Sequence, residues 1–332
     1  MKKLLSALLL FLGCSKAGPE LHILNWGEYF ADDTIAKFEK ESGCRVIYDK
    51  FDSPEALRAK LDHTPSGYDV VFPSDELVPS LAAGGKLEKL DLSKLPNFKN
   101  IAAAFKGLGY DAKNEWSVPY MWSTTGIAYN RERVKPAPDS WAAIFDAKIQ
   151  DHLSILEDPR EVFAAALRLD GCDLAALTPE MIDKAKARLL GVKPKLVNGQ
   201  PQDAMRKADV WIAQMYGGDA AQVGESVGYV IPKEGGTFWV DNICIAKGST
   251  RIDLAHKFID FLMRADVAAA NSNYKKYPSP NEAAKPMINK AILENPTIYP
   301  PADVLARCKL LGEMKPELKK RLMDAWGEFN AK

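Results

Sequence analysis

Short apolar runs that read as strands alternate with amphipathic segments that read as helices along the first quarter of the chain. The first predicted helix ends at Gly43, because glycine commonly terminates helices. The second begins at Ser53-Pro54, an N-cap residue followed by proline at the first helical position. This alternating order predicts a largely parallel α/β lobe. The predicted elements are strand 21–25, helix 33–42, a strand from Arg45, a helix carrying Leu57 and Leu61, and strand 68–72.

The chain is long enough to bury two hydrophobic cores. It has 332 residues, 47% of them hydrophobic, whereas a single core stops growing at roughly 250–300 residues. Past the aromatic run at 116–122 a second series of elements is predicted, which indicates a second α/β lobe. Its elements are strand 153–156, helices 161–169 and 179–190, and strand 210–214.

Both lobes are expected to be discontinuous in sequence. The strand-like run 238–246 is followed by a predicted helix over 253–264, whose apolar residues recur at helical spacing. We interpret this pair as a return to the first lobe. The tail from residue 289 reads as helical and is expected to pack on the second lobe. The predicted lobes are therefore 18–123 plus 243–288, and 124–242 plus 289–332.

The first residues have the form of an export signal. A short basic start precedes the apolar run 4–12, which is far shorter than the roughly 20 residues that a membrane-spanning helix needs. The run ends in Phe11-Leu12-Gly13-Cys14, which resembles a bacterial lipobox apart from Phe11, where an aliphatic residue is usual. We expect residues 1–13 to be a lipoprotein signal peptide and Cys14 to be lipidated, so that the protein is periplasmic and anchored to the membrane. An ordinary secretory signal is the alternative.

Charge and cysteine content indicate neither a nucleic-acid partner nor a disulfide scaffold. The chain has 44 basic residues, Lys and Arg, and 44 acidic ones, so no positive excess directs it to nucleic acid. Besides Cys14, an even number of cysteines remains, which could pair in an oxidising compartment. We favour buried free thiols, because Cys44 and Cys244 lie in strand-like runs where a small thiol packs well. The remaining cysteines are Cys44, Cys172, Cys244 and Cys308.

Signatures of catalysis and of metal or cofactor binding are weak. Residues 224–228 match the G-x-S-x-G pattern, but a nucleophile elbow needs a helix after the serine, and a strand-like run follows here. The histidines are scattered without metal-ligand spacing, and the Gly-Gly pairs lack the Lys-Ser/Thr ending of a phosphate loop. We expect no metal, no cofactor and no enzymatic activity, with a hydrolase as the alternative of a different class.

Some short stretches combine aromatic rings with carboxylates. Three of them directly follow predicted strands, and the ligand sites of parallel sheets lie just beyond the carboxyl ends of strands. Carboxylates attract a cation, while Trp and Tyr rings also attract its charge and shield its methylenes from water. The stretches therefore predict a site for an organic cation. They are Asn25-Trp26-Gly27-Glu28-Tyr29, Pro73-Ser74-Asp75-Glu76, Glu157-Asp158-Pro159-Arg160-Glu161 and Phe238-Trp239-Val240-Asp241.

The same stretches also have purely structural interpretations. Asp158 can be a helix N-cap, with Glu161 at the third helical position in a capping box, and this role is compatible with ligand binding. The rings of the first stretch could be core aromatics, and the adjacent acids at 75–76 are expected to be at least partly solvated. Trp239 and Asp241 alternate along a strand and so share a face, where a buried carboxylate needs a partner.

A set of motifs follows one another in a fixed order along nearly the whole mature chain. The motifs are residues 25–29, 68–74, 119–122 with Gly126 and 129–130, 158–163, 232–236 with 238–241, and 277–281. In this order they resemble the spermidine/putrescine-binding proteins of bacterial ABC importers. The ordered set is far more specific than any single motif.

This resemblance implies an α/β, two-lobed periplasmic-binding-protein-like fold of class II. Each lobe would be a mainly parallel sheet flanked by helices, with the ligand in the cleft between the lobes. It also implies a monomeric receptor that closes like a hinge on a polyamine, putrescine or spermidine, and delivers it to the permease subunits of an ABC transporter. The same fold binding another small solute, such as iron, thiamine or an anion, is the alternative.

By position, the ligand contacts of the family fall on the aromatic-acid stretches and on a later tyrosine. Asp75 is added as the neighbour of Ser74, and Met215 stands where the family has a tryptophan. Packing is the alternative role for Met215, with the neighbouring Tyr216 as the replacement for the missing ring. Glu76 replaces a tyrosine and Leu311 a glutamine, which leaves the choice among polyamines open. The candidate site residues are Trp26, Gly27, Glu28, Tyr29, Ser74, Asp75, Asp158, Glu161, Met215, Trp239, Asp241 and Tyr277.

Overall fold

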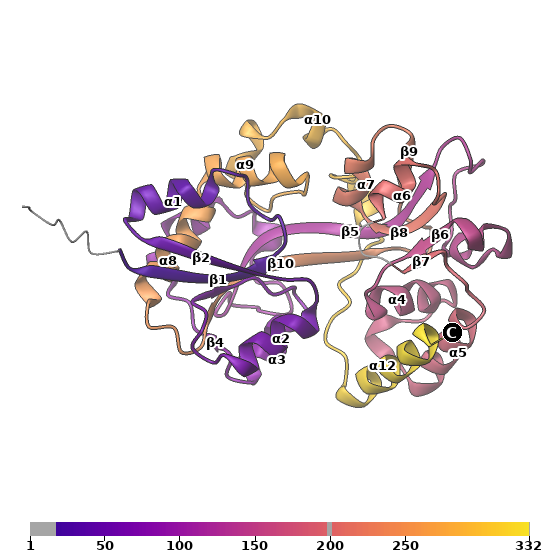
Figure 1. Ribbon diagram of the computed structural model, residues 1–332, viewed down its shortest axis with the longest axis horizontal. Coiled ribbons are helices and arrows are strands. Elements are labelled where there is room, and N and C mark those ends of the chain that lie inside the picture. Colours follow the sequence, from indigo (N-terminus) through magenta and orange to yellow (C-terminus); the bar gives the residue numbers. More distant parts are fainter. Residues whose placement is uncertain (1–17, 198–200, 332) are drawn as a thin grey trace, which may run out of the picture.

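The computed structural model describes residues 18–197 and 201–331, so the predicted signal peptide and Cys14 lie outside the described residues. Two lobes lie side by side along the long axis of the molecule and are joined by two long strands (Figure 1). These strands are β5 (Val118–Asn130) and β10 (Thr237–Ala246), which pair in antiparallel orientation. None of the helices in the two described ranges combines the length and the apolar character needed to cross a bilayer.

One path of paired strands runs through both lobes. The other strands are β1 (Glu20–Trp26), β2 (Arg45–Phe51), β3 (Val70–Val71), β4 (Leu87–Glu88), β6 (Leu153–Ile155), β7 (Leu196–Val197), β8 (Ile212–Tyr216) and β9 (Val227–Val230). Their order is β2-β1-β3-β10-β5-β8-β6-β7, with β4 paired to β10 and β9 to β5. The outer strands of each lobe pair in parallel, whereas β5 and β10 are antiparallel to all their partners.

Helices cover both faces of the sheet in the first lobe (Figure 1). They are α1 (Thr34–Ser42), α2 (Pro54–His63), α3 (Leu77–Ala83), α8 (Ile252–Leu262) and α9 (Ala265–Lys275). On one face Phe38 of α1 packs against Phe258 of α8, with ring centroids 4.8 Å apart. On the other face Leu57 and Leu61 of α2 share a cluster with Leu81 of α3. Each face therefore has its own apolar core.

The ends of the first two helices lie where local signals predict them. Gly43 follows α1 in the left-handed conformation, with φ at 71°, and its N–H donates to the carbonyl of Glu39. The Ser53 side chain accepts the N–H of Ala56 at 3.2 Å, and Pro54 is the first residue of α2. Both predicted boundaries are confirmed.

The second lobe also has helices on both faces of its sheet (Figure 1). They are α4 (Pro159–Leu169), α5 (Pro179–Leu189), α6 (Gln202–Arg206), α7 (Gly217–Val223) and α12 (Pro316–Asn330). On one face Phe163 of α4 and Ile182 of α5 share a cluster with Leu322 of α12. On the other face Met205 of α6 clusters with Ala220 of α7.

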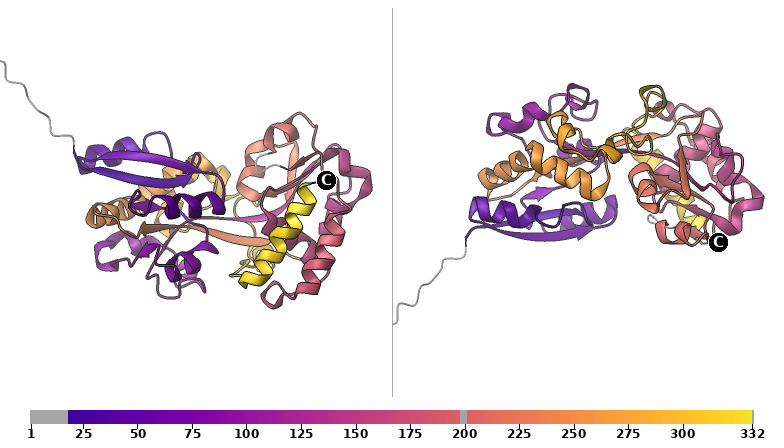
Figure 2. Two further views of the ribbon diagram at one scale, coloured as in Figure 1. Left: turned by 60° about the horizontal axis from the view of Figure 1, so that its bottom comes forward. Right: turned by 90° about the horizontal axis from the view of Figure 1, so that it is seen from above.

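The C-terminal tail divides between the two lobes. Its first helices are α10 (Lys290–Leu293) and α11 (Ala302–Leu305). Ile292 of α10 packs with Ala268 and Ala269 of α9, which belongs to the first lobe. The final helix α12 instead packs against α4 and α5 of the second lobe, as the yellow helix in Figure 2 shows. The end of the tail therefore packs on the second lobe, as expected. The start of the tail packs on α9 instead.

Short 3-10 helices fill several connections. Among their residues, Trp141 is fully buried and its indole N–H donates to the carbonyl of Gly235 at 2.7 Å, which holds one of these turns on the second lobe. The 3-10 helices are η1 (Leu92–Lys94), η2 (Pro96–Asn100), η3 (Ala103–Phe105), η4 (Trp141–Phe145), η5 (Ala147–His152), η6 (Leu174–Ala176) and η7 (Glu282–Met287).

The predicted two-lobed α/β fold is confirmed. The sheet is mixed rather than mainly parallel in the second lobe, because β5 pairs there with antiparallel β8 and β9 as well as with β10. The cysteines of the described residues are free, as favoured from the sequence. Cys44, Cys244 and Cys308 are buried, whereas Cys172 is only partly so.

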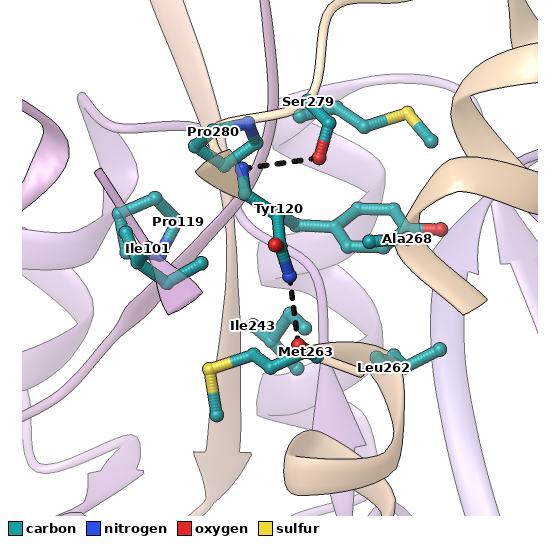
Figure 3. A pocket seen from close by; sticks show the side chains of 11 residues that line it. Ile101, Pro119, Tyr120, Ile243, Leu262, Met263, Ala268, Ser279 and Pro280 are labelled. Atoms are coloured by element: carbon teal, nitrogen blue, oxygen red, sulfur yellow. Dashed lines mark hydrogen bonds between the residues drawn. The ribbon is translucent and has the colours of Figure 1, made fainter. Parts of the chain in front are cut away.

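A small pocket lies inside the first lobe, between β5, β10 and the helices α8 and α9 (Figure 3). Its volume of about 10 Å³ is room for about one water molecule, so it cannot hold an organic ligand. Asn281 lines it and donates its side-chain amide to the carbonyl of Met263 at 2.7 Å, while its backbone N–H donates to Ser279 Oγ at 3.2 Å. These bonds hold the segment that follows Tyr277, one of the candidate site residues.

Candidate ligand-binding site

The junction of the two lobes brings together three of the aromatic-acid stretches. Tyr29, which follows β1, donates its hydroxyl to Oδ2 of Asp241 in β10. Ser74 forms an isolated β-bridge with Asp241, and the N–H of Val240 donates to Oδ1 of Asp75 at 3.0 Å. Segments from the ends of β1 and β3 therefore converge on Val240 and Asp241 in a strand that both lobes share.

A β-bulge lies beside Asp241. The pairing of β10 with β5 shifts register between Asp241 and Asn242, since Asp241 pairs with Met121 and Asn242 with Pro119. Bulges bend a strand and re-aim its side chains, and proline cannot supply a ladder N–H. Before the bulge, Trp239 and Asp241 lie two residues apart and so face the same side of the strand.

Aromatic rings form a chain next to Asp241. Ring centroids are 6.0 Å apart for Tyr29 and Tyr277, 5.5 Å for Trp239 and Tyr277, and 5.3 Å for Tyr216 and Trp239. The rings meet edge to face, an arrangement that aromatic pairs favour. Tyr29 and Tyr277 are buried, whereas Tyr216 and Trp239 remain partly exposed. The chain of rings gives the junction an apolar wall that solvent can still reach.

Polar atoms without hydrogen-bond partners gather around the same carboxylate. The ring of Trp26 packs against Phe51 with centroids 4.3 Å apart. Within the described residues, its indole N–H, the indole N–H of Trp239 and Oγ of Ser74 are buried without a hydrogen bond. The Trp26 indole nevertheless lies close enough to lower the pKa of Asp241. Buried polar atoms are nearly always satisfied by protein or ordered water, so these donors are available to water or to a ligand beside Asp241.

A second pair of acids lies at the start of α4, across the junction. Asp158 is the N-cap of α4 and accepts the N–H of Arg160 at 2.8 Å and of Glu161 at 3.3 Å. Glu161 does not reach back to complete the predicted capping box. Its carboxylate instead accepts the hydroxyls of Thr125 in β5 at 2.9 Å and Thr237 in β10 at 2.7 Å. Long-range pairing thus replaces the local bond, and both shared strands help to hold Glu161.

Burial raises the pKa values of these acids. Desolvation is the largest cause in each case, and it brings the pKa of Asp241 to about 7, of Asp158 to about 6 and of Glu161 to about 7. The charge of Glu76 further raises the pKa of Asp241 and of Asp158. Burial and Glu76 also hold the pKa of Asp75 well above its usual range. Carboxylates from both lobes are therefore close enough to disfavour one another's charge, which a bound cation would relieve.

Asp158 combines partial solvent access with strong desolvation. Its side chain is accessible to solvent, yet surrounding protein raises its pKa. Asp75, by contrast, is only 3% exposed, so the expectation that it is partly solvated is wrong. Its neighbour Glu76 is partly exposed as expected.

Two predicted residues form the exposed turn after β1. Gly27 and Glu28 are both exposed. Glu28 adopts φ of 55°, a left-handed conformation that is uncommon outside glycine. In the described parts of the chain, the Glu28 carboxylate makes no hydrogen bond or ion pair with another side chain. Its place in a site therefore stays a prediction.

Met215 lies in the core of the second lobe. Its side chain is fully buried and clusters with Met205 and Ala220. The adjacent Tyr216 is the residue of β8 whose ring packs against Trp239. Side chains alternate between the two faces of a strand, so Met215 points into the core and Tyr216 points toward Trp239. Tyr216 therefore supplies the aromatic ring that Met215 lacks.

The structure adds two residues that the sequence reading missed. Asp219 lies in the first turn of α7 and is 4% exposed, and Lys275 Nζ lies 3.8 Å from its Oδ1. Asp219 could have been found, because it follows β8 just as the other acids follow their strands. Lys275 ends a helix with no such signal nearby. Within the described residues, groups of His, Cys, Asp and Glu suited to hold a metal ion do not occur.

The protein has two lobes joined by shared strands, and acids and aromatic rings from both lobes lie at the junction. These features define a two-lobed solute-binding protein. The chain belongs to the bacterial extracellular solute-binding protein family, whose model matches residues 33–299. It is 36% identical to the putrescine-binding periplasmic protein PotF of Escherichia coli, over 92% of this chain and 90% of that protein. It is 31% identical to the putrescine/cadaverine-binding protein of Pseudomonas aeruginosa, over 99% of each.

The comparison of solved structures agrees with these relatives. A putative spermidine/putrescine ABC transporter protein from Listeria monocytogenes superimposes with a TM-score of 0.90 at 32% identity, over 94% of this chain and 99% of that one. The resemblance to polyamine-binding proteins, predicted from the ordered motifs, is confirmed. The family and these relatives are solute-binding proteins, and PotF is periplasmic.

Proposed function

We propose that this protein is an extracytoplasmic receptor that captures a polyamine, putrescine or spermidine, between its lobes and delivers it to the permease of an ABC importer. The observation that carries this function is the convergence of Asp75, Asp158 and Asp241 from both lobes beside a wall of aromatic rings. The ligands named for PotF and for the Pseudomonas protein support the same class.

The arrangement suits a flexible dication better than other solutes. Each ammonium end of a polyamine needs carboxylate partners, because a buried charge without them is costly. Asp241 and the pair Asp158 and Glu161 offer two such places, and the rings of Trp239 and Tyr216 can cover the methylenes between them. Burial raises the pKa of Asp158 and of Asp241, and the charge of Glu76 raises both further. An added anion would meet the same unfavourable surroundings and would be disfavoured. We assign the protein the role of binding a polyamine and closing its lobes on it, without catalysis.

We propose further that the lobes close about the two shared strands. The predicted boundaries, 123/124 and 242/243, fall inside β5 and β10. Val118 and Ile243 belong to the core cluster of the first lobe, whereas Ile127 belongs to that of the second, which supports this division. Closure about these strands would bring Asp241 and Asp158 to the same ligand.

The N-terminal residues support a lipid anchor on the receptor. The motif at 11–14 would place a lipidated Cys14 just before the folded body, which begins its first strand at Glu20. Mass spectrometry of the mature N-terminus tests the anchor: acylation on Cys14 is expected, and a mature protein that starts beyond residue 14 would contradict it.

Calorimetry on protein freed of copurified ligand tests the proposed function. Saturable binding of putrescine or spermidine is expected, with an affinity near micromolar, which corresponds to roughly 8 kcal/mol. A sugar or an anion such as sulfate serves as the control ligand and should give no heat. Absence of binding by both polyamines would overturn the assignment.

Binding should weaken as the pH falls, because protonated carboxyls lose their attraction for ammonium groups. The pKa of Asp241 is raised to about 7 and that of Asp158 to about 6, so the loss should lie between about pH 8 and about pH 5.5. The ligand-free protein should respond in the opposite sense. An acid with a raised pKa binds more protons folded than unfolded, so acidification through this window favours the folded state. Calorimetry and thermal melting at both pH values check the two trends, and affinity that rises on acidification would contradict the first.

A further inference from the structure

A buried arginine lies behind the acid pair at the start of α4. Arg168 is 7% exposed and follows Glu161 by two helical turns, so both side chains lie on one face of α4. Charged side chains are seldom fully buried unless they are paired, and burial lowers the pKa of Arg168. Among the described residues, however, the ion pairs do not include Arg168. Its burial therefore needs another explanation.

A hydroxyl links the guanidinium of Arg168 to Glu161. Nη1 of Arg168 donates to Oγ1 of Thr237 at 3.0 Å, and this hydroxyl donates to Oε2 of Glu161 at 2.7 Å. A guanidinium has donors and no acceptor, so the one hydrogen of the hydroxyl is directed away from Arg168 and toward the carboxylate. A positively charged donor also polarises the hydroxyl and strengthens the bond that it gives. The order of donors therefore favours a negative carboxylate at Glu161.

The other contacts of Glu161 fit the same orientation of its carboxylate. Thr125 donates to Oε1 at 2.9 Å, so each carboxylate oxygen accepts one hydroxyl. A carboxylate has about four lone-pair sites, so both oxygens can accept further donors, such as the ammonium of a ligand. Gln214 donates its side-chain amide to the backbone carbonyl of Glu161 at 2.8 Å, which holds the first turn of α4 in place. These partners are buried, so water has little access to the bonds.

The charge of Glu161 depends on two opposed neighbours. Burial and then the charge of Asp158 raise the pKa of Glu161, the charge of Arg168 counteracts them, and the balance is about 7. Burial also raises the pKa of two tyrosine hydroxyls and one thiol nearby, so these groups are neutral near pH 7. Among these neighbours, Arg168 is therefore the cation that opposes Asp158. The titratable groups that face Glu161 are Asp158, Arg168, Tyr216 of β8, Tyr229 of β9 and Cys308 after α11.

We propose that Arg168 is a positioning residue of the ligand site, which acts through the Thr237 hydroxyl to keep the Glu161 carboxylate negative and oriented toward the ligand. The inference rests on the proposed polyamine function and deepens it. It explains how an ammonium partner stays charged where burial and a second acid oppose that charge. In this role Arg168 does not contact the ligand itself, and a cation of the protein assists the binding of a cationic ligand.

The bond from Arg168 to Thr237 also joins α4 to β10, and a purely structural role makes a different prediction. If Arg168 only ties the two elements together, its loss lowers the melting temperature and weakens binding by a similar factor at every pH. If it keeps Glu161 charged, its loss raises the pKa of Glu161, and binding weakens most where this carboxyl becomes protonated. The pH dependence of binding therefore separates the two roles.

The experiment measures the putrescine affinity of Arg168→Met and of the intact protein by calorimetry between about pH 8.5 and about pH 6. The loss in the variant should be about tenfold at about pH 6, the change that about 1.4 kcal/mol produces. It should be less than about twofold at about pH 8.5, where Glu161 is mostly charged in both proteins. Thr237→Val keeps the shape of the side chain and removes the hydroxyl, so its loss should also grow as the pH falls.

Two further variants test whether the effect passes through the charge of Glu161. Arg168→Lys keeps the positive charge and can donate to the same hydroxyl, so it should recover most of the affinity that Arg168→Met loses at low pH. In a Glu161→Gln background, Arg168→Met should add little further loss, because the group on which Arg168 acts no longer titrates. A full additional loss in that background would contradict the inference.

Arg188 provides the matched control for the substitution. It lies in α5 of the same lobe, and its guanidinium pairs with Asp170, so Arg188→Met should leave the pH dependence of binding unchanged. Thermal melting establishes that each variant is folded, and where Arg168→Met does not fold, Thr237→Val decides. If the folded variants bind putrescine with the pH dependence of the intact protein, the inference is wrong while the polyamine function stands. If the intact protein binds neither putrescine nor spermidine, the proposed function itself fails, and the inference with it.

Discussion

Asp241→Asn should weaken putrescine binding by about tenfold or more, equivalent to a loss of at least about 1.4 kcal/mol. The replacement has nearly the same shape, and its amide oxygen can still accept the hydroxyl of Tyr29. What disappears is the negative charge at the place where segments of both lobes meet. Because a buried ammonium needs a charged partner, the loss falls directly on binding. Calorimetry with purified, ligand-free protein measures it.

The stability of the same variant separates a ligand contact from a structural residue. Desolvation raises the pKa of Asp241 to about 7, so its charged form is disfavoured in the ligand-free protein. A neutral amide should therefore leave the melting temperature unchanged or higher. Asp203→Asn makes the same chemical change on an exposed side chain of α6 that pairs with Arg206. Because an exposed ion pair contributes only about 0–1 kcal/mol, affinity should not change and melting should change little. Unchanged affinity in Asp241→Asn would remove this residue from the site.

Gly218→Ala should lower both binding and stability. A Cβ atom on Gly218 would lie 2.0 Å from Cδ1 and 2.3 Å from Cε1 of Tyr277, and 2.9 Å from the carbonyl oxygen of Lys276. Tyr277 must then move away from its contacts with Tyr29 and Trp239. Overpacking of this kind costs about 1–3 kcal/mol, and displacement of the central ring should reduce putrescine affinity by about tenfold.

Gly327→Ala is the matched control for this substitution. Gly327 lies inside α12, and a Cβ atom there would meet no described atom within 4 Å beyond its chain neighbours and the nearby backbone of its own helix. Alanine in a helix is more favourable than glycine by about 0.5–1 kcal/mol, so melting should rise slightly while affinity stays the same. A Gly218→Ala protein that melts and binds like the parent would show that the close approach of α7 to Tyr277 is not required.

Local chemistry made much of the fold predictable. Gly43 and Ser53 end and begin helices because their backbone and side chain satisfy helix ends, and these effects act within a few residues. Asp158 caps α4 for the same reason. The position of ligand-contacting candidates just after strands follows from the way parallel strands end at one edge of a sheet. These features need no knowledge of distant partners.

The remaining features depend on partners far along the chain. Glu161 leaves its expected capping bond because β5 and β10 bring two threonine hydroxyls to it. The contact between Lys275 and Asp219 exists only because α9 ends beside α7. Met215 faces the core and Tyr216 faces Trp239 because the register of β8 against β5 decides which side chain points to which side. One sequence contains no direct signal for such registers, since a shift of one residue reverses the faces of a strand.

The β-bulge beside Asp241 interrupts a strand that belongs to both halves of the molecule. If the lobes close about β5 and β10 as proposed, the segment that bends would lie next to Asp241, one of the proposed ligand contacts. A substitution that makes this segment more rigid should then also change ligand affinity. Lobe closure and ligand specificity would therefore be expected to evolve together.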